Sequence, residues 1–469
     1  MKTPGLSLVS PQITPRLDAS FRPAVLANQA FRQAVAACDQ PVPLTIALEQ
    51  ADGSIFHFAT KVLPKVDPRS GGNVRYAERL VKFLLWSRGG FRVYVAGSPS
   101  IATALQEHFA DTKTGQFDAN LMGDRVYERP FQVVAANENE IPAERSNTMP
   151  LGRQWDGCRI GFDLGASDRK VAAVQDGKCV FSEEYVWNPV PQSDPQWHFD
   201  QIMDTLRKAA AHLPRVDAIG GSAAGVYVNN RVKVASLFRG VPPAQFHSRV
   251  KDLFLEMRQA WGGIPFEVVN DGEVTALAGS MAIGENAVLG IAMGSSQAAG
   301  YVTPEGNITS WLNELAFAPI DYSEMAPVDE WSGDAGCGAQ YFSQQAVGRL
   351  LEIAGVAVEP GMGLPDKLKQ VQALMQAGDY RALKIYETLG TYLGYGLAHY
   401  AEFYDFKNVL ILGRVMTGTG GDLILQGAKD VLRKEFPDLS GRISFHTPDE
   451  KEKRHGQAMA AASLPRAAK

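Results

Sequence analysis

The sequence is poor in cysteine, has no long apolar run, and is dominated by neither sign of charge. Its four cysteines, Cys38, Cys158, Cys179 and Cys337, lie far apart and form no Cys-x-x-Cys pair. This spacing argues against a disulfide framework and against a zinc ribbon. No apolar stretch approaches the roughly 20 residues of a membrane helix, and the opening MKTPGLSLVSPQITPRLD has no apolar core of signal-peptide length. We therefore expect a cytoplasmic protein without a membrane partner.

The charge balance excludes one further class of partner. The chain has 46 Lys and Arg residues against 51 Asp and Glu residues, a net charge of -5. Nucleic-acid binders usually carry a basic excess or a basic face, so no nucleic-acid partner is expected. The 469 residues are 45% hydrophobic and 21% charged, as in ordinary globular proteins. At about 100–200 residues per domain, this length predicts two or three domains.

The first 140 residues have the pattern of a small α/β unit. Residues 44–63 predict two strands around an Asp52-Gly53 turn, and residues 76–90 predict a helix that stops at Gly89. Ser98 is placed to cap a further helix. The polar stretch 136–157 predicts a linker. We therefore expect residues 1–150 to form an accessory domain and a linker. The two roles considered for this domain are dimerisation and the covering of a ligand cleft.

One aromatic run in this unit leaves two interpretations open. The spacing of Phe83, Trp86, Phe91 and Tyr94 fits side chains that pack in a core. The same rings would also serve to bind a ligand. Beyond residue 157, strands alternate with helices, and the early strands are joined by tight turns, which predicts α/β layers with a mixed sheet.

A first candidate site follows an apolar strand at Asp163-Leu-Gly165-Ala166-Ser167. Backbone N–H groups of a small-residue turn can approach phosphate oxygens closely. A carboxylate such as Asp163 can order water bound to magnesium, and Lys170 could reach phosphate. An ordinary turn between two strands has the same pattern.

Two further glycine turns could serve a nucleotide. Gly294-Ser295-Ser296 lies between two apolar strands, where it would either cradle phosphate or simply close a hairpin. An apolar strand also ends at Gly413 and leads into a glycine-rich turn around Gly418, a pattern that suits a nucleotide and is common elsewhere.

The pair Asn270-Asp271 follows another apolar strand and precedes an Ala-rich helix. A carboxylate at that point faces the crevice where α/β folds bind ligands, and it could take a proton from a substrate hydroxyl. The alternative is that Asp271 only caps the helix.

The order of these features along the chain is more specific than any one of them. From about residue 159 to residue 465 the chain resembles the ROK family of sugar kinases, glucokinase-like members of the actin/hexokinase/Hsp70 superfamily. The segments that carry the resemblance are, in order, IGFDLGASDRKVAAV, GGSAAGVYVNNRVKVASL, VNDGEVTALAG, LGIAMGSSQAAGYV and VLILGRVMTGTGG.

The resemblance implies two ribonuclease-H-like lobes around a cleft, over residues 151–285 and 286–469, and an ATP- and Mg²⁺-dependent phosphorylation of a hydroxyl of a hexose or related sugar. It also suggests a homodimer. It makes Asp271 the general base and places Asp163 near magnesium. It places the substrate against Ser222, Gly225, Asn270 and Glu314. It places the nucleotide against Gly165, Ala166, Ser167, Lys170, Gly294, Ser295, Ser296, Gly413 and Gly418.

The chain departs from the family pattern on the sugar side. Phe317 stands where the family has a histidine, Ala339 stands where a sugar-contacting glutamate is expected, and Cys337 alone cannot make a tetrahedral zinc site. No zinc is therefore expected. Nearby Asp334, with Glu330 and Gln340, would replace the lost contacts or be solvated loop residues.

These departures keep other functions open. The chain could be a non-catalytic regulator that binds sugar or nucleotide, or a kinase of a non-glucose acceptor. The first 140 residues do not resemble the helix-turn-helix domain of ROK repressors, because they contain strands and their helices lack a basic recognition face.

Overall fold

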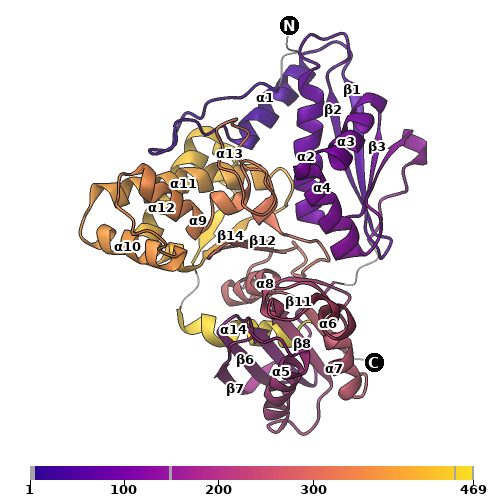
Figure 1. Cartoon of the computed structure of the whole chain (residues 1–469), viewed down its shortest axis with the longest axis vertical. Helices are drawn as coiled ribbons and strands as arrows, with labels where there is room; N and C mark the ends of the chain where they lie inside the picture. The colour runs from indigo at the N-terminus through magenta and orange to yellow at the C-terminus, as the bar shows by residue number, and fades with distance from the viewer. Residues whose placement is uncertain (1–5, 147–149, 448–449, 467–469) are drawn as a thin grey trace.

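The computed structural model describes residues 6–146, 150–447 and 450–466, in three units that each have their own β-sheet (Figure 1). We call them the N-terminal, middle and C-terminal units. Their strand orders are β2-β1-β3-β4, β11-β8-β5-β6-β7 and β13-β12-β14-β15. The mixed α/β class predicted from the sequence is confirmed. Within the described ranges, no helix is both long and apolar enough to cross a bilayer.

The N-terminal unit packs helices on a four-stranded sheet in which only β3 and β4 are parallel. Its strands are β1 (Val42–Glu49), β2 (Ile55–Val62), β3 (Arg92–Ala96) and β4 (Gln132–Ala136). Its helices are α1 (Ala24–Ala36), α2 (Gly72–Arg88), α3 (Pro99–Asp111), α4 (Lys113–Asn120), η1 (Leu121–Tyr127) and η2 (Glu138–Glu140). The predicted turn is confirmed by Gly53 at φ +81, and the predicted helix stop by Gly89 at φ +80, both in the left-handed region that favours glycine.

The middle unit begins with an antiparallel run of three strands, to which two parallel strands are added. The run is β5 (Cys158–Leu164), β6 (Asp168–Gln175) and β7 (Lys178–Val186); β8 (Ala218–Ala223) and β11 (Phe266–Asn270) are parallel to β5 and to each other. Its other elements are α5 (Pro195–Ala210), β9 (Val226–Val228), β10 (Arg231–Val234), η3 (Ser236–Phe238), α6 (Pro243–Gln245), η4 (Phe246–Val250) and α7 (Leu253–Ala260).

The C-terminal unit joins a hairpin to two parallel strands. The strands are β12 (Val288–Met293), β13 (Gln297–Val302), β14 (Asn408–Leu412) and β15 (Ser444–His446). Its helices are η5 (Leu315–Phe317), η6 (Gly338–Gln340), α9 (Gln344–Ile353), α10 (Leu364–Gln376), α11 (Tyr380–Tyr400), η7 (Arg414–Met416), α12 (Thr419–Glu435) and α13 (Pro437–Ser440).

Two helices join the middle and C-terminal units. α8 (Asp271–Ile283) follows β11 of the middle unit and packs on β12 and β13. The last helix, α14 (Glu450–Ala462), crosses back onto the middle sheet (Figure 1). Gly161 and Gly220 permit this close approach, since a Cβ at either position would lie within 1.8 Å of a carbonyl oxygen of α14. The start of α8 is thus fixed between two sheets.

The N-terminal unit is buried most deeply against the C-terminal unit, through α2. Glu78, Arg79 and Lys82 of α2 are buried, together with Asp118 of α4 and Asp334 of the C-terminal unit. We call these five residues the ionic cluster. Nζ of Lys82 lies 2.9 Å from Oδ2 of Asp118 and 3.1 Å from Oδ2 of Asp334, and Nη1 of Arg79 lies 2.9 Å from the same Asp334 oxygen. The sequence left Asp334 as a sugar contact or a solvated loop residue, and the structure shows neither.

The N-terminal unit touches the middle unit through a partly exposed contact at Glu128. Glu128, directly after η1, pairs with Lys251 at 2.6 Å and with Lys233 at 3.2 Å. The segment expected to be a linker is also held in place where it is described: the N–H of Gly152 donates to Leu464 at 3.3 Å, and that of Gln154 donates to Ser463 at 3.0 Å. The N-terminal unit therefore contacts both other units.

Candidate active site

The carboxyl ends of three neighbouring strands bring predicted site residues together. Asp163 of β5 pairs in register with Ser222 of β8, and the next strand, β11, ends at Asn270. The hydroxyl of Ser222 donates to Oδ1 of Asp163 at 2.6 Å. Ser222 therefore fixes the position of the Asp163 carboxyl, and both side chains are buried at this sheet edge.

A hydrogen bond closes the turn between β5 and β6, and the ammonium group of Lys170 lies beside this turn. The N–H of Gly165 donates to the carbonyl of Asp168 at 2.9 Å, and Ala166 and Ser167 are exposed at the tip. Nζ of Lys170 lies 3.0 Å from Asp168 and 3.5 Å from Asp163. Burial lowers the pKa of Lys170, but the two carboxylates outweigh it and raise that pKa. The ammonium is thus charged and faces the turn.

Magnesium fits this turn only in a largely hydrated form. Among the described residues, no three His, Cys, Asp or Glu side chains converge on a point where they could hold a metal ion. Mg²⁺ usually keeps several waters and binds through one or two carboxylates together with substrate phosphates. Asp163 offers such a carboxylate.

Asn270, not Asp271, caps helix α8. Its Oδ1 accepts the N–H of Gly272 at 2.7 Å, while its Nδ2 donates to the carbonyl of Gly225 at 2.7 Å. The interpretation of Asp271 as the cap is therefore wrong, since the helix begins at Asp271 itself, one residue earlier than that role requires. Gly225 must be glycine here, with φ at +128 and a Cβ position 2.3 Å from the carbonyl oxygen of Val234.

The carboxyl of Asp271 lies among other acidic groups. Burial raises its pKa to about 6, with a contribution from the charge of Asp163, and backbone N–H groups oppose the shift. Glu314 lies nearby: burial, and then the charge of Asp271, raise the pKa of Glu314 to about 7. An acid with a pKa near 6 is ionised at neutral pH and still basic enough to accept a proton.

Helix α2 of the N-terminal unit positions Glu314. The N–H of Glu314 donates to the carbonyl of Trp86 at 2.9 Å, and the N–H of Asn313 donates to that of Ser87 at 3.0 Å. Phe317, at the position where the resemblance leads one to expect a histidine, packs on the Trp86 ring with centroids 4.3 Å apart. The N-terminal unit thus occupies the space beside the segment that carries Glu314 and Phe317.

Sequence reasoning missed Glu273. Its side chain is buried in the first turn of α8, accepts from the side chain of Asn313, and accepts the N–H of Tyr301 at 3.3 Å. Burial raises the pKa of Glu273 to about 8. A carboxyl group inside an otherwise apolar, Ala-rich helix was the signal that could have identified it. Glu273 ties the start of α8 to the segment that carries Glu314.

The predicted nucleotide residues of the C-terminal unit meet at its sheet edge. Gly294, Ser295 and Ser296 form the tip of the β12–β13 hairpin, with both serines exposed. A Cβ on Gly413 would lie 2.4 Å from the carbonyl oxygen of Met293, so the end of β14 lies against this hairpin. Gly413 and Gly418 line a cavity of about 440 Å³.

A larger cavity lies beside helices α8 and α14. It has a volume of about 630 Å³ and is lined mainly by residues of these two helices, such as Gly279 and Gln457, and also by Lys170 of β6 and Leu412 of β14. Among the described residues, no hydrogen bond or ion pair joins the Gly165–Ser167 turn to the Gly294–Ser296 tip. The structure therefore places the predicted site residues in two groups, with this cavity between the units that carry them.

Comparison with known proteins identifies the fold. No family model matches the chain, and neither does any curated protein sequence. A ROK hexokinase from Thermus thermophilus superposes with a TM-score of 0.52 and 18% identity, over 65% of this chain and 96% of that one. The chain has a ROK sugar-kinase-like fold.

The same fold is shared by a protein of a different role. A ROK family transcriptional regulator, a homolog of the E. coli MLC protein, also gives a TM-score of 0.52 at 18% identity, over 65% of this chain and 78% of that one. Because the ROK fold carries both enzymes and a regulator, the site residues must decide the function of this chain.

Proposed function

We propose that the protein is an ATP- and Mg²⁺-dependent carbohydrate kinase that phosphorylates a hydroxyl of a hexose or related sugar, with Asp271 as the general base. The observation that carries the proposal is the state of Asp271. Its carboxyl is not the cap of α8, lies beside Glu314, and has a pKa near 6. This is the state expected of a group that removes a proton at neutral pH.

In this proposal the middle and C-terminal units are the two ribonuclease-H-like lobes, and ATP binds between them. Lys170 and the exposed turn beside it contact the phosphates, as does the Gly294–Ser296 tip. Gly413 and Gly418 line the pocket for the nucleoside. Asp163 would hold the magnesium ion that accompanies ATP, and the ion would neutralise phosphate charge there. The hexokinase of the same fold supports the reaction class.

The chemical step needs little beyond positioning and charge stabilisation. The acceptor hydroxyl gives its proton to the Asp271 carboxylate as its oxygen bonds to the γ-phosphorus. The bond from that phosphorus to the β–γ bridging oxygen breaks, and ADP leaves with the electron pair. Glu314 accepts or donates a hydrogen bond at a second hydroxyl. Asn270, already bonded to Gly225, holds the loop that borders the acceptor.

One observation favours the second candidate, a regulator that binds sugar or nucleotide without catalysis. Lys170 lies 3.5 Å from Asp163 and already neutralises the carboxylate that magnesium would use. A regulator with this fold is known among the solved structures. A protein of this kind would bind ATP or sugar and release no ADP.

The test is a coupled ADP-release assay with Mg-ATP and a panel of hexoses, ketoses and amino sugars. We expect turnover with at least one sugar, and a loss of about 10²–10⁴-fold in kcat for Asp271→Asn. Asp366→Asn on α10, a mostly exposed aspartate, is the matched control and should keep full activity. ATP binding without ADP release for any sugar would refute the kinase and favour the regulator.

A further inference from the structure

A further cavity lies at the seam between the N-terminal unit and the middle unit, and we call it the seam cavity. Its volume is about 320 Å³. Asp124 and Arg125 of η1, with Glu128 directly after it, form one wall, and residues of β10, η3, α6 and η4 form the rest. Since η1 packs against β10, the cavity is bounded by two units that touch each other. A volume of this size is at the lower end for ligand pockets, so a small molecule fits it.

The charged side chains that line the seam cavity are mostly cationic. The lining contains two acids and four Lys or Arg residues, namely Asp124 and Glu128, and Arg125, Lys233, Arg239 and Lys251. Among the described residues, neither Arg125 nor Arg239 forms an ion pair. Asp252, which follows Lys251 in the chain, is already paired with Arg231 at 2.9 Å. The cavity therefore has more positive than negative charge, although the chain as a whole has a net charge of -5.

A single carboxylate oxygen serves both lysines of the seam cavity. Oε1 of Glu128 lies 2.6 Å from Nζ of Lys251 and 3.2 Å from Nζ of Lys233. The two ammonium groups are therefore close enough for one group of oxygen atoms to contact both. Burial lowers the pKa of Lys233; Glu128 opposes this shift, and the charges of Lys251 and Arg231 add to it. A second anion would reduce the repulsion between these cations.

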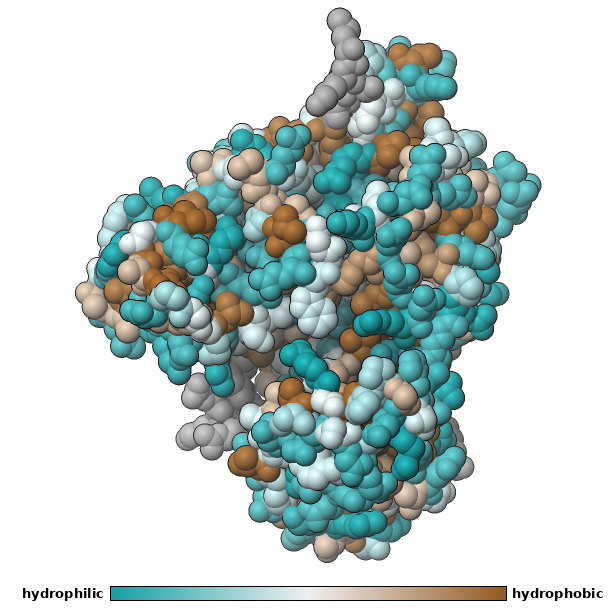
Figure 2. Space-filling model, viewed as in Figure 1, coloured by the Kyte–Doolittle hydropathy of each residue, from teal (hydrophilic) through white to brown (hydrophobic). Residues whose placement is uncertain are grey.

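The seam cavity also has an apolar floor. It consists of Val232, Phe238 and Val241, which are buried, and Phe246, which is half-buried. The visible face of the middle unit is otherwise largely hydrophilic (Figure 2). Apolar side chains next to a few charged groups are typical of small-molecule sites. This lining suits a ligand that has an anionic group at one end and a carbon body at the other.

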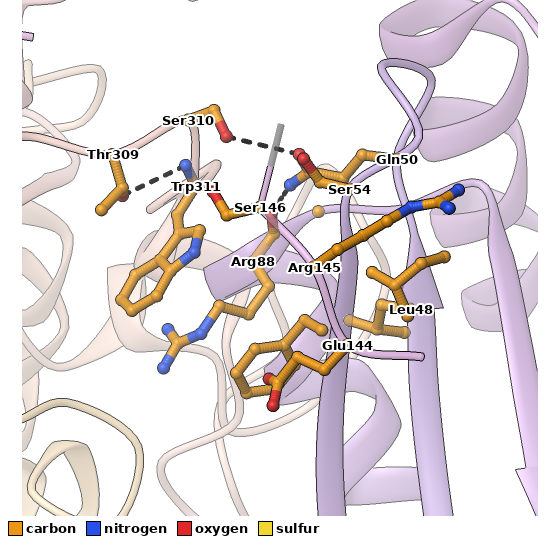
Figure 3. Close-up of a pocket in the computed structure, with 13 residues that line it drawn as sticks. Leu48, Gln50, Ser54, Arg88, Glu144, Arg145, Ser146, Thr309, Ser310 and Trp311 are labelled. Carbon is orange, nitrogen blue, oxygen red and sulfur yellow. Dashed lines mark hydrogen bonds between the residues drawn. The ribbon is translucent and has the colours of Figure 1, made fainter. Parts of the chain in front are cut away.

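Another pocket of the N-terminal unit contains a cation that no ligand can reach. Figure 3 shows Arg88 beside Trp311 in this pocket. The guanidinium carbon lies 3.6 Å from the centroid of the Trp311 ring and 4.5 Å from that of Tyr404, and Nε and Nη1 are buried. Aromatic rings therefore cover this charge. In the seam cavity, by contrast, the side chains of Lys251 and Glu128 are 26% and 35% exposed, so a solute has access to the ion pair.

We propose that the seam cavity binds a phosphate monoester of a small molecule, with Lys233 and Lys251 on the phosphate and the apolar floor on the carbon body. A phosphate monoester carries about two negative charges at pH 7 and three strong acceptor oxygens. It can therefore contact more cations than a carboxylate can. Among the described lining residues are none of Asp163, Asp271 and Glu314, so this site is separate from that of the proposed kinase reaction.

The experiment is a calorimetric titration of the full chain with phenyl phosphate, without ATP or sugar. Three related compounds separate the parts of the ligand. Inorganic phosphate lacks the carbon body, benzoate has a carboxylate in place of the phosphate, and phenol lacks the charge. We expect phenyl phosphate to bind about tenfold more tightly than inorganic phosphate and about tenfold more tightly than benzoate, and phenol to give no detectable binding.

Four variants assign the binding to the seam cavity. Lys233→Met and Lys251→Met should each raise the Kd for phenyl phosphate about tenfold, because each removes a charged hydrogen bond. Lys208→Met, on α5 outside the cavity and with its side chain 45% exposed, is the matched control and should keep the Kd of the wild type. Glu128→Gln removes the competing carboxylate and should lower the Kd about threefold. Such a gain in affinity cannot come from a loss of folding.

A fifth variant separates the seam cavity from the proposed nucleotide site. Lys170→Met removes the ammonium beside the β5–β6 turn. If this change weakens phenyl phosphate while Lys233→Met and Lys251→Met do not, the ligand binds at that turn and the proposal is overturned. It is also overturned if phenyl phosphate does not bind the wild type, or if benzoate binds equally well. The titration requires no release of ADP, so failure of the kinase proposal leaves this result unaffected, and the reverse also holds.

Discussion

Removal of one buried ammonium should strongly destabilise the junction of the N-terminal and C-terminal units. Lys82 is 1% exposed in the ionic cluster, and its Nζ lies 2.9 Å from Asp118 and 3.1 Å from Asp334. Lys82→Met keeps the length and apolar stem of the side chain. It leaves two buried carboxylates without the ammonium that lies between them.

The size of the effect follows from these distances. At an effective dielectric constant near 20, each ion pair contributes about 5 kcal/mol of attraction. Burial of an ammonium group opposes this by several kcal/mol, so the loss on breaking a buried pair is smaller, about 3–5 kcal/mol. We expect Lys82→Met to lower the free energy of unfolding by this amount.

Urea unfolding followed by circular dichroism at pH 7 measures the loss, with Lys61→Met, exposed on β2, as the control expected to stay near zero. The pH dependence gives a second check. Burial raises the pKa of Asp334, but Arg79 and Lys82 outweigh it and hold that pKa well below the usual range. Its contribution is therefore present above about pH 4 and lost as the pH falls further. A loss under about 1 kcal/mol at pH 7 would refute the reasoning.

Three further changes test the site. If Asp271 is the base, kcat/KM for the sugar should fall about tenfold per pH unit below about pH 6, since the protonated carboxyl accepts no proton, and a flat rate profile from pH 5 to 8 would exclude that role. Gly225→Ala should abolish sugar binding in calorimetry, because its Cβ would lie 2.3 Å from a carbonyl oxygen, whereas Gly262→Ala, also at positive φ but with nothing within 4 Å, should keep it. Asn270→Ala should lower the free energy of unfolding by about 1 kcal/mol through loss of the α8 cap, and equal urea midpoints for variant and wild type would contradict this.

Local signals in the sequence were sufficient to predict the helices, turns and strands that carry the site. Glycines at positive φ ended α2 and closed the β1–β2 turn as predicted, because that conformation is costly for other residues. Of the aromatic run, Phe83, Trp86 and Phe91 are buried, which confirms packing for these three. The strand-turn-strand pattern likewise placed Asp163 at a strand end.

The contacts between distant segments could not be predicted. Arg79 and Lys82 look like solvated charges on a helix, since their partner Asp334 lies some 250 positions further along. The role of Asn270 depended on a helix boundary displaced by one residue, and both it and Asp271 are good caps. The burial of Glu273 depends on segments that fold against α8 from elsewhere in the chain.

The N-terminal unit is attached with very different strength to its two neighbours. On one side, buried ion pairs hold α2 against the C-terminal unit. On the other, the partly exposed pair of Glu128 with Lys251 is of a kind worth about 0–1 kcal/mol and is weakened by salt. Salt should therefore weaken the contact between the N-terminal and middle units more than the buried ionic contact between the N-terminal and C-terminal units.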